Sequence, residues 1–221
     1  MSLYNQPMIK TVLLFIALVI SAPALEIIQK PIHFSEHRQQ LTLEYIREHY
    51  GLSPKDITID PRIIVVHFTA IPTLQGSFEA FDGEELPSSR KDISTKSATA
   101  NVSVQYLVDR DGTVYQLMPD NWMARHVIGL NYSSIGIENV GTLGDLTEAQ
   151  LKANIGLIRE IKKSYPAVDY LIGHSEYRCF ETTPFWLEKD RSYRTEKSDP
   201  GEAFMQGLRD ALPAFKKAPC R

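Results

Sequence analysis

The chain has 221 residues, which is enough for one well-packed domain and short for two. Its 43% hydrophobic and 23% charged residues are ordinary for a globular protein. The net charge of −3 gives no reason to expect nucleic acid as a partner, because no basic surface is available in excess to neutralise phosphates.

The N-terminal segment has the order of a secretory signal, with a basic residue, an apolar run and small residues. Lys10 precedes the apolar run Val12–Ile20, and an A-x-A motif follows at 22–24. The run is too short to span a bilayer comfortably, although an uncleaved anchor or a buried helix is the alternative. We predict a signal peptide over residues 1–24 and an exported protein, periplasmic or secreted, without a stable membrane anchor. Met8 is an alternative start, with residues 1–7 as an extension.

The first half of the mature chain contains a helix and a buried strand. A helix is predicted over residues 37–50 and ends at Gly51. The β-branched run Ile63–Phe68 is typical of a strand that is covered on both faces. Residues 71–96 are rich in Pro, Gly, Ser and charge and have no sustained period. We predict a long surface loop there, of the kind that forms the wall of a binding groove.

A hairpin follows, with strands over residues 102–108 and 113–118 around the turn Asp109–Gly112. A further strand is predicted over residues 134–140. The capping-box pattern that begins at Thr147 then opens a helix that Pro166 stops.

A short strand over residues 170–172 delivers His174 at its end, and a last helix is predicted over residues 200–211. These elements indicate one α/β domain over residues 25–221, in which helices flank a central mixed sheet. Cys179 and Cys220 would meet an oxidising compartment after export, where they form either a disulfide or two free buried thiols.

Three polar side chains from separate segments are candidate metal ligands. His67 ends the apolar strand Ile63–Phe68, His174 follows the strand at 170–172, and Asp199 precedes the last helix. Two imidazoles and one carboxylate make a three-ligand site for Zn²⁺ that leaves a fourth position for water, as in a catalytic zinc site. The spacing alone is a weak pattern, since no His-Glu-x-x-His helix is present.

Five motifs in one order strengthen this interpretation: Ile64–Ala70, Val102–Gly112, Ser134–Glu138, Gly173–Ser175 and Lys197–Gly201. In that order they resemble the zinc N-acetylmuramoyl-L-alanine amidases related to phage lysozyme-type amidases and peptidoglycan recognition proteins. The resemblance extends from about residue 63 to 204 and implies the fold of that family. It also implies that His67, His174 and Asp199 bind Zn²⁺.

The same resemblance implies roles for three other residues, and Arg125 precedes one of them in the chain. Glu138 matches the family's acid/base carboxylate, which would move a proton from water to the leaving nitrogen. Lys197 matches a basic residue beside the metal that would stabilise the oxyanion. His126 matches a histidine beside the substrate cleft, where it would contact substrate or support the site. Arg125 is a candidate for the cleft wall, with a solvated arginine as the equal alternative.

Two features depart from the family. Gln105 stands where the family often has histidine, so any contribution from that position would come from a neutral amide. The segment 175–198 is longer than usual and contains Phe180, Phe185, Trp186 and Tyr193. These aromatic residues either form a rim over a sugar or peptide or pack on the domain surface.

We therefore predict a monomeric zinc amidase that cleaves the bond between N-acetylmuramic acid and L-alanine in peptidoglycan or muropeptides. One alternative is a recognition module that binds peptidoglycan without cutting it, although such relatives typically lose a ligand. A zinc peptidase that acts elsewhere in the stem peptide is the other alternative, because zinc activates water for attack on any amide. Intact wall, soluble muropeptides and anhydro-muropeptides all stay open as substrates.

Overall fold

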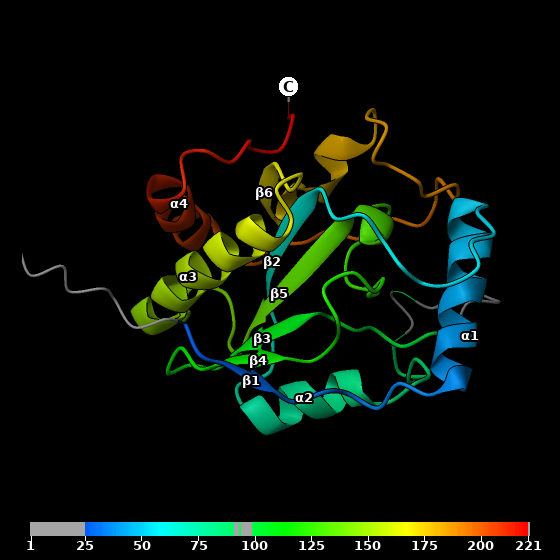
Figure 1. Cartoon of the computed structure of the whole chain (residues 1–221), viewed down its shortest axis with the longest axis horizontal. Coiled ribbons are helices and arrows are strands. Elements are labelled where there is room, and N and C mark those ends of the chain that lie inside the picture. The colour runs from blue at the N-terminus through cyan, green and yellow to red at the C-terminus, as the bar shows by residue number, and fades with distance from the viewer. Residues whose placement is uncertain (1–24, 91–92, 94–98, 221) are drawn as a thin grey trace, which may run out of the picture.

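The computed structural model describes residues 25–90, 93 and 99–220, so the predicted signal peptide at 1–24 lies outside the described residues. A six-stranded sheet forms the centre, in the order β1-β4-β3-β5-β2-β6 (Figure 1). Only β3 and β4 pair antiparallel among these strands, which confirms the predicted mixed sheet. The strands are β1 (Ile27–Gln29), β2 (Ile63–Phe68), β3 (Tyr106–Val108), β4 (Val114–Gln116), β5 (Ser134–Asn139) and β6 (Tyr170–Gly173).

Strand β2 lies between β5 and β6, and both of its faces are buried. Ile64 and Val66 pack against the side chains of α3 (Glu148–Ser164) and α4 (Glu202–Ala211). Ile63 and Val65 face the opposite way, toward a cluster that includes Phe180. Two covered faces explain why this strand is a continuous run of β-branched residues rather than an alternating one.

The first helix and the helix that begins after Thr147 lie where the sequence predicts them. Helix α1 (Glu36–Tyr45) continues into the π-helical turn η1 (Ile46–Tyr50), which ends at Gly51 with a φ of 63°. Thr147 and Gln150 form the predicted capping box at the start of α3. None of the helices in the described part of the chain is long and apolar enough to cross a membrane.

The prediction of a long surface loop over residues 71–96 was wrong in part, because helix α2 (Leu74–Asp82) lies within it. The segment does contribute to a cavity wall, as predicted, through Ile71 and Phe81. Thr73 caps this helix by accepting a hydrogen bond from the Gly76 amide at 3.2 Å. Gly76 and Ser77 have low helix propensity, so a helix was not predicted from the sequence here. In the structure, Phe81 of this helix is buried in the same cluster as Leu107 of the sheet. Tertiary packing therefore decides the structure of this segment.

The hairpin was predicted at the correct place, but both of its strands were predicted too long, the first by four residues. Residues 102–105 do not pair with β4; instead the Ser103 amide donates to the Arg125 carbonyl at 3.0 Å. The side chain of Gln105 makes its hydrogen bonds with the backbone of Trp122 and Gly136, outside the hairpin. Only Tyr106–Val108 is left to pair as strand β3.

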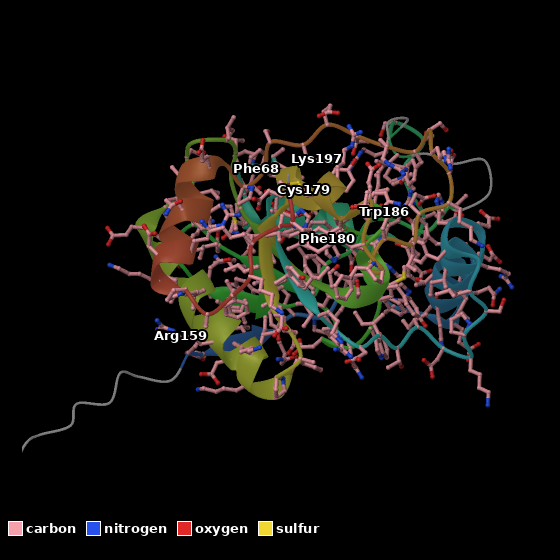
Figure 2. The ribbon with its side chains drawn as sticks, turned by 90° about the horizontal axis from the view of Figure 1, so that it is seen from above. Phe68, Arg159, Cys179, Phe180, Trp186 and Lys197 are labelled. Carbon is pink, nitrogen blue, oxygen red and sulfur yellow. A yellow bond between two sulfur atoms is a disulfide. The ribbon has the colours of Figure 1, made fainter. Side chains whose placement is uncertain are left out.

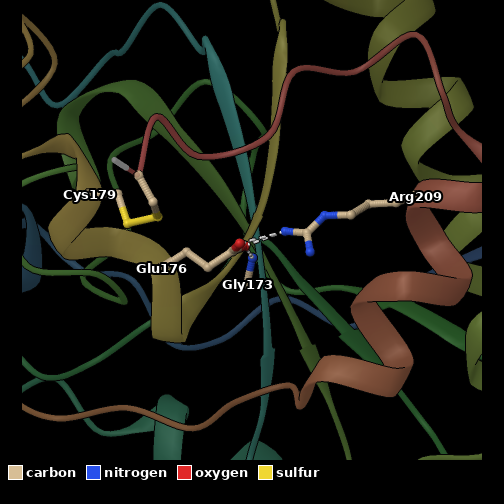
Figure 3. Close-up of a disulfide and its surroundings, with 5 residues drawn as sticks. Gly173, Glu176, Cys179 and Arg209 are labelled. Atoms are coloured by element: carbon tan, nitrogen blue, oxygen red, sulfur yellow. Dashed lines mark hydrogen bonds and ion pairs between the residues drawn. A yellow bond between two sulfur atoms is a disulfide. The ribbon is translucent and has the colours of Figure 1, made fainter.

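Cys179 and Cys220 form a disulfide, with a Cα–Cα distance of 4.8 Å. The bridge joins the C-terminal tail to the 3₁₀ segment η3 (His174–Phe180) (Figure 3). Beside it, Glu176 accepts from the Gly173 amide at 2.8 Å and pairs with Arg209 of α4. The alternative of two free thiols was therefore wrong.

Candidate metal centre and active-site cleft

Three ligand-type atoms meet at the carboxyl ends of β2 and β6. The Nδ1 atoms of His67 and His174 lie 2.9 Å apart, and Asp199 Oδ2 lies 3.1 Å and 2.9 Å from them, respectively. All three residues are buried. A tetrahedral ion with bonds of about 2.0–2.1 Å separates its ligands by about 3.3 Å, so a small expansion of this triangle would hold one. The predicted ligands therefore form one group that suits a metal ion.

The sheet register and one glycine bring these atoms together. Val66 pairs with Gly173 across β2 and β6, so His67 on β2 and His174, the first residue after β6, follow at the same level of the sheet. A Cβ on Gly173 would lie 2.9 Å from Pro200 Cδ, closer than real Cβ contacts allow. The missing side chain lets the Asp199–Pro200 segment lie directly against the end of β6. The Ser175 amide then donates to the Asp199 carbonyl at 3.0 Å and fixes this approach.

Glu138 lies on β5 directly opposite His67 on β2. Its Oε2 atom is buried and has no hydrogen-bond partner in the described part of the chain. Burial raises the pKa of Glu138 to about 7, against the opposing effect of His67. A carboxyl group with a pKa near neutrality can both accept and return a proton, as general acid–base catalysis requires.

A cavity of about 310 Å³ opens beside these residues and is lined by Glu138, His174, Lys197 and Asp199. Lys197 and Phe68 lie on the same side of the molecule and both line this cavity (Figure 2). Burial raises the pKa of Glu138, and the positive charge of Lys197 acts in the opposite direction. The structure thus places two predicted ligands, the carboxylate and the lysine around one hollow, with His67 in contact with the two ligands.

Residues 57–202 match the model of a family described as N-acetylmuramoyl-L-alanine amidase. The chain belongs to this family. Its reaction class is therefore hydrolysis of the amide bond between N-acetylmuramic acid and L-alanine.

Relatives support the assignment. The amidase is 31% and 32% identical to the 1,6-anhydro-N-acetylmuramyl-L-alanine amidase AmpD of two Salmonella typhimurium strains. Each match covers 71% of this chain and 81% of the relative.

Solved structures show the same fold. An endolysin amidase, LysCS of Clostridium intestinale, matches with a TM-score of 0.52 at 17% identity, over 89% of this chain and 100% of that one. Bumblebee PGRP-SA matches with a TM-score of 0.52 at 18% identity, over 90% of this chain and 100% of that one.

In this amidase, His126 lies behind His67 rather than in the triangle. Its Nδ1 is 3.0 Å from His67 Nε2, and its Nε2 is 3.2 Å from Ser134 Oγ. Burial and the two other imidazoles hold the pKa of His126 well below its usual value. His126 also lines the cavity, so its predicted place beside the cleft agrees with the structure.

Arg125 lies in the cavity wall, but its guanidinium is not solvated. It donates to the carbonyls of Ile93 and Ala100 and to Tyr193 Oη, and it lies 4.8 Å from the ring centroid of Tyr45. Both terminal nitrogens of Arg125 therefore have partners within the protein. The alternative of a solvated arginine was wrong, and direct substrate binding by Arg125 stays a prediction.

The two departures from the family pattern have structural explanations. Gln105 is fully buried, donates to the Trp122 carbonyl and accepts from the Gly136 amide, both at 2.8 Å. It therefore links β5 to a neighbouring loop. In the long segment, Phe180 and Tyr193 are buried in the core, while Trp186 packs over Gly129. Tyr193 and Thr195 line the cavity as well, so the segment mainly packs but also contributes to the cleft.

Tyr45 is a cavity residue that the sequence did not reveal. It lies at the end of α1, its side chain is buried, and its Oη has no hydrogen-bond partner within the described ranges. Its ring stacks on His49 at 4.1 Å between centroids. No motif surrounds Tyr45, and an aromatic residue on a helix is usually a core residue, so only the folded chain shows this position.

Proposed function

We propose that this amidase cleaves its substrate with Zn²⁺ held by His67, His174 and Asp199. The observation that carries the proposal is the buried triangle of two imidazole nitrogens and one carboxylate oxygen beside the cavity. Two nitrogens and one oxygen form a donor set that suits zinc and leaves one position open. When bound, Zn²⁺ would acidify water and polarise the substrate carbonyl.

Glu138 and Lys197 would perform the proton transfer and the charge stabilisation. Glu138, opposite His67, would take a proton from the attacking water and return it to the leaving alanine nitrogen. Lys197 would face the carbonyl oxygen as it gains negative charge. Arg125 and His126 would shape the cleft wall that receives the substrate.

The substrate class is peptidoglycan or its muropeptides, and we propose that the protein acts as a monomer after export and signal cleavage over residues 1–24. The basic and apolar N-terminal sequence supports export. The Cys179–Cys220 disulfide supports it independently, because such bonds persist mainly in oxidising compartments.

The deciding experiment is mass spectrometry of defined muropeptides after incubation with the protein, with and without a chelator. We expect release of the intact stem peptide with a free L-alanine amine, and no product after chelation. Cleavage within the stem peptide would instead indicate a peptidase. Binding without any product would indicate a recognition module.

A further inference from the structure

A second hollow lies next to the catalytic cavity, between the loop that follows β5 and the first turn of α4. It is a groove of about 330 Å³. Leu143 in its wall is 60% exposed, and in the described part of the chain only Ile28 is another large hydrophobic residue that is exposed. We call it the Leu143 groove, and its mainly apolar walls are formed by Leu143, Leu146, Leu151, Pro200, Gly201 and Phe204.

The Leu143 groove is continuous with the catalytic cavity on two sides. Asp199 lines the cavity, and Gly201, two residues further on, lines the groove. Ile71 of the cavity wall forms an isolated bridge with Gly141, two residues before Leu143. The two groove walls approach closely, because a Cβ on Gly201 would lie 3.1 Å from Leu143 Cδ1. A substrate that extends past Asp199 on this side therefore enters the groove.

The charges of the cavity suit the peptide side of the substrate. Glu138 and Asp199 belong to the catalytic group. Histidines aside, the other charged residues that line the cavity within the described ranges are all basic, namely Arg90, Arg125 and Lys197. Stem peptides carry carboxylates, which basic side chains attract. The bond to be cut has the peptide on one side and the glycan on the other, so the sugars need a path of their own.

The Leu143 groove has the properties that suit an uncharged sugar. No basic residue lines it in the part of the chain that the structure describes, and Glu148 at its edge is paired with Lys152 at 2.7 Å. Glu202, in the first turn of α4, is exposed and accepts hydrogen bonds. The start of α4 has no side-chain cap, so its first amides are available as donors. A pyranose ring presents C–H groups on its faces and hydroxyl groups at its edge, which match apolar walls with a polar rim.

We propose that the Leu143 groove is a subsite for the glycan strand, and that it holds the sugar next to the muramic acid whose amide bond is cut. The inference rests on the proposed function, because it places the reacting bond at Asp199 and the two histidines. The groove volume falls in the range of small-ligand sites, about 300–1,000 Å³. Strand-linked peptidoglycan, rather than a single released muropeptide, is then the preferred substrate.

The first test measures binding without catalysis, by calorimetry of the metal-free protein with glycan strands that carry no peptide. We expect the wild type to bind the strands. Leu143→Ser should bind them about 10-fold more weakly or worse, the usual effect of removing an apolar group from a pocket. Ile28→Ser is the matched control, because Ile28 is exposed on β1 and does not line the groove. It should bind the strands as the wild type does.

The second test compares hydrolysis of strand-linked peptidoglycan with hydrolysis of a monomeric muropeptide. We expect a lower KM for the strand-linked substrate in the wild type. Leu143→Ser should raise that KM by about 10-fold and so remove most of the difference between the two substrates. Ile28→Ser should keep the difference.

The outcomes separate the groove from the proposed function. Equal strand affinity in the wild type and Leu143→Ser, or no strand binding by the wild type, would overturn the subsite. A dimer in sedimentation that Leu143→Ser dissociates would overturn it too, since the groove would then be a contact between two copies of the chain. Strand binding without hydrolysis of either substrate would instead overturn the proposed function and leave a protein that recognises glycan.

Discussion

At the scale of single residues, the candidate site contains two carboxyl groups whose pKa values are shifted in opposite directions. Asp199 has its pKa held far below the ordinary value by hydrogen bonds to His174 and His67, which outweigh its burial. Glu138, a short distance along the same cleft, has its pKa raised to about 7 by burial. One carboxylate is thus kept ionised, as a ligand must be, while the other can exchange a proton.

Replacement of Glu138 by glutamine should separate proton transfer from metal binding. Gln keeps the shape of Glu138 but cannot take a proton, so turnover should fall by about 10²-fold or more while zinc stoichiometry and substrate affinity stay nearly unchanged. Kinetics, metal analysis and calorimetry would measure the three quantities. Glu148→Gln, at the exposed start of α3, is the control and should behave as wild type. Unchanged turnover in Glu138→Gln would refute the assigned role.

Metal removal tests the three ligands together. Exhaustive chelation should abolish hydrolysis and added Zn²⁺ should restore it, because no side chain replaces the activated water. Asp199→Ala should lose metal stoichiometry and activity, whereas His126→Ala should still reach one zinc per chain at saturating metal. A zinc-free His126→Ala protein beside a zinc-replete His174→Ala protein would show that the wrong imidazole was assigned.

At the scale of elements, the ligand-bearing strands could be predicted and several connections could not. Strand β2 is identifiable because a strand covered on both faces is continuously apolar, and His67 interrupts that run. Helix α2 was missed because its packing partners lie in β3 and after β4, far away in the sequence. The same reason hides the cavity position of Tyr45, whose ring meets Arg125 from a distant segment.

The contact between β6 and the start of α4 gives a prediction at this scale. In Gly173→Ala the new Cβ would meet Pro200 Cδ at 2.9 Å and Met205 Cγ at 3.1 Å. Such overpacking typically costs about 1–3 kcal/mol of folding free energy, and it should also move Asp199 away from His174 and weaken zinc binding. Thermal denaturation and metal titration would measure both effects.

Gly156→Ala is the matched control for that change. Gly156 lies inside α3, and the nearest atom to an added Cβ is 3.7 Å away on Leu25. Alanine is favoured over glycine in a helix interior by about 1 kcal/mol, so stability should rise with no change in zinc affinity. A Gly173→Ala protein as stable as the wild type would show that the Asp199 segment adapts to the added methyl group.

At the scale of the whole molecule, the disulfide joins the chain end to the segment that carries His174. It closes a loop with a sequence separation of 41 residues, which in the chain-entropy model stabilises the fold by about 3–4 kcal/mol. Reduction should therefore lower the melting temperature and leave zinc bound, because neither sulfur belongs to the metal centre. Thiol titration of the denatured, unreduced protein should find no free thiol, and two reactive thiols per chain would contradict the bridge.

The covalent ring between Cys179 and Cys220 also encloses Asp199, Lys197 and the whole of α4. Residues 189–192 lie inside that ring and are exposed, with the basic residues Lys189 and Arg191 among them. A single cut after Arg191 by a trypsin-like protease would leave one covalent molecule, in which the fragment that contains Asp199 stays attached beside His174. Such nicked protein would run as one band without reductant and as two bands with it, and the fragments that carry His174 and Asp199 would stay covalently joined.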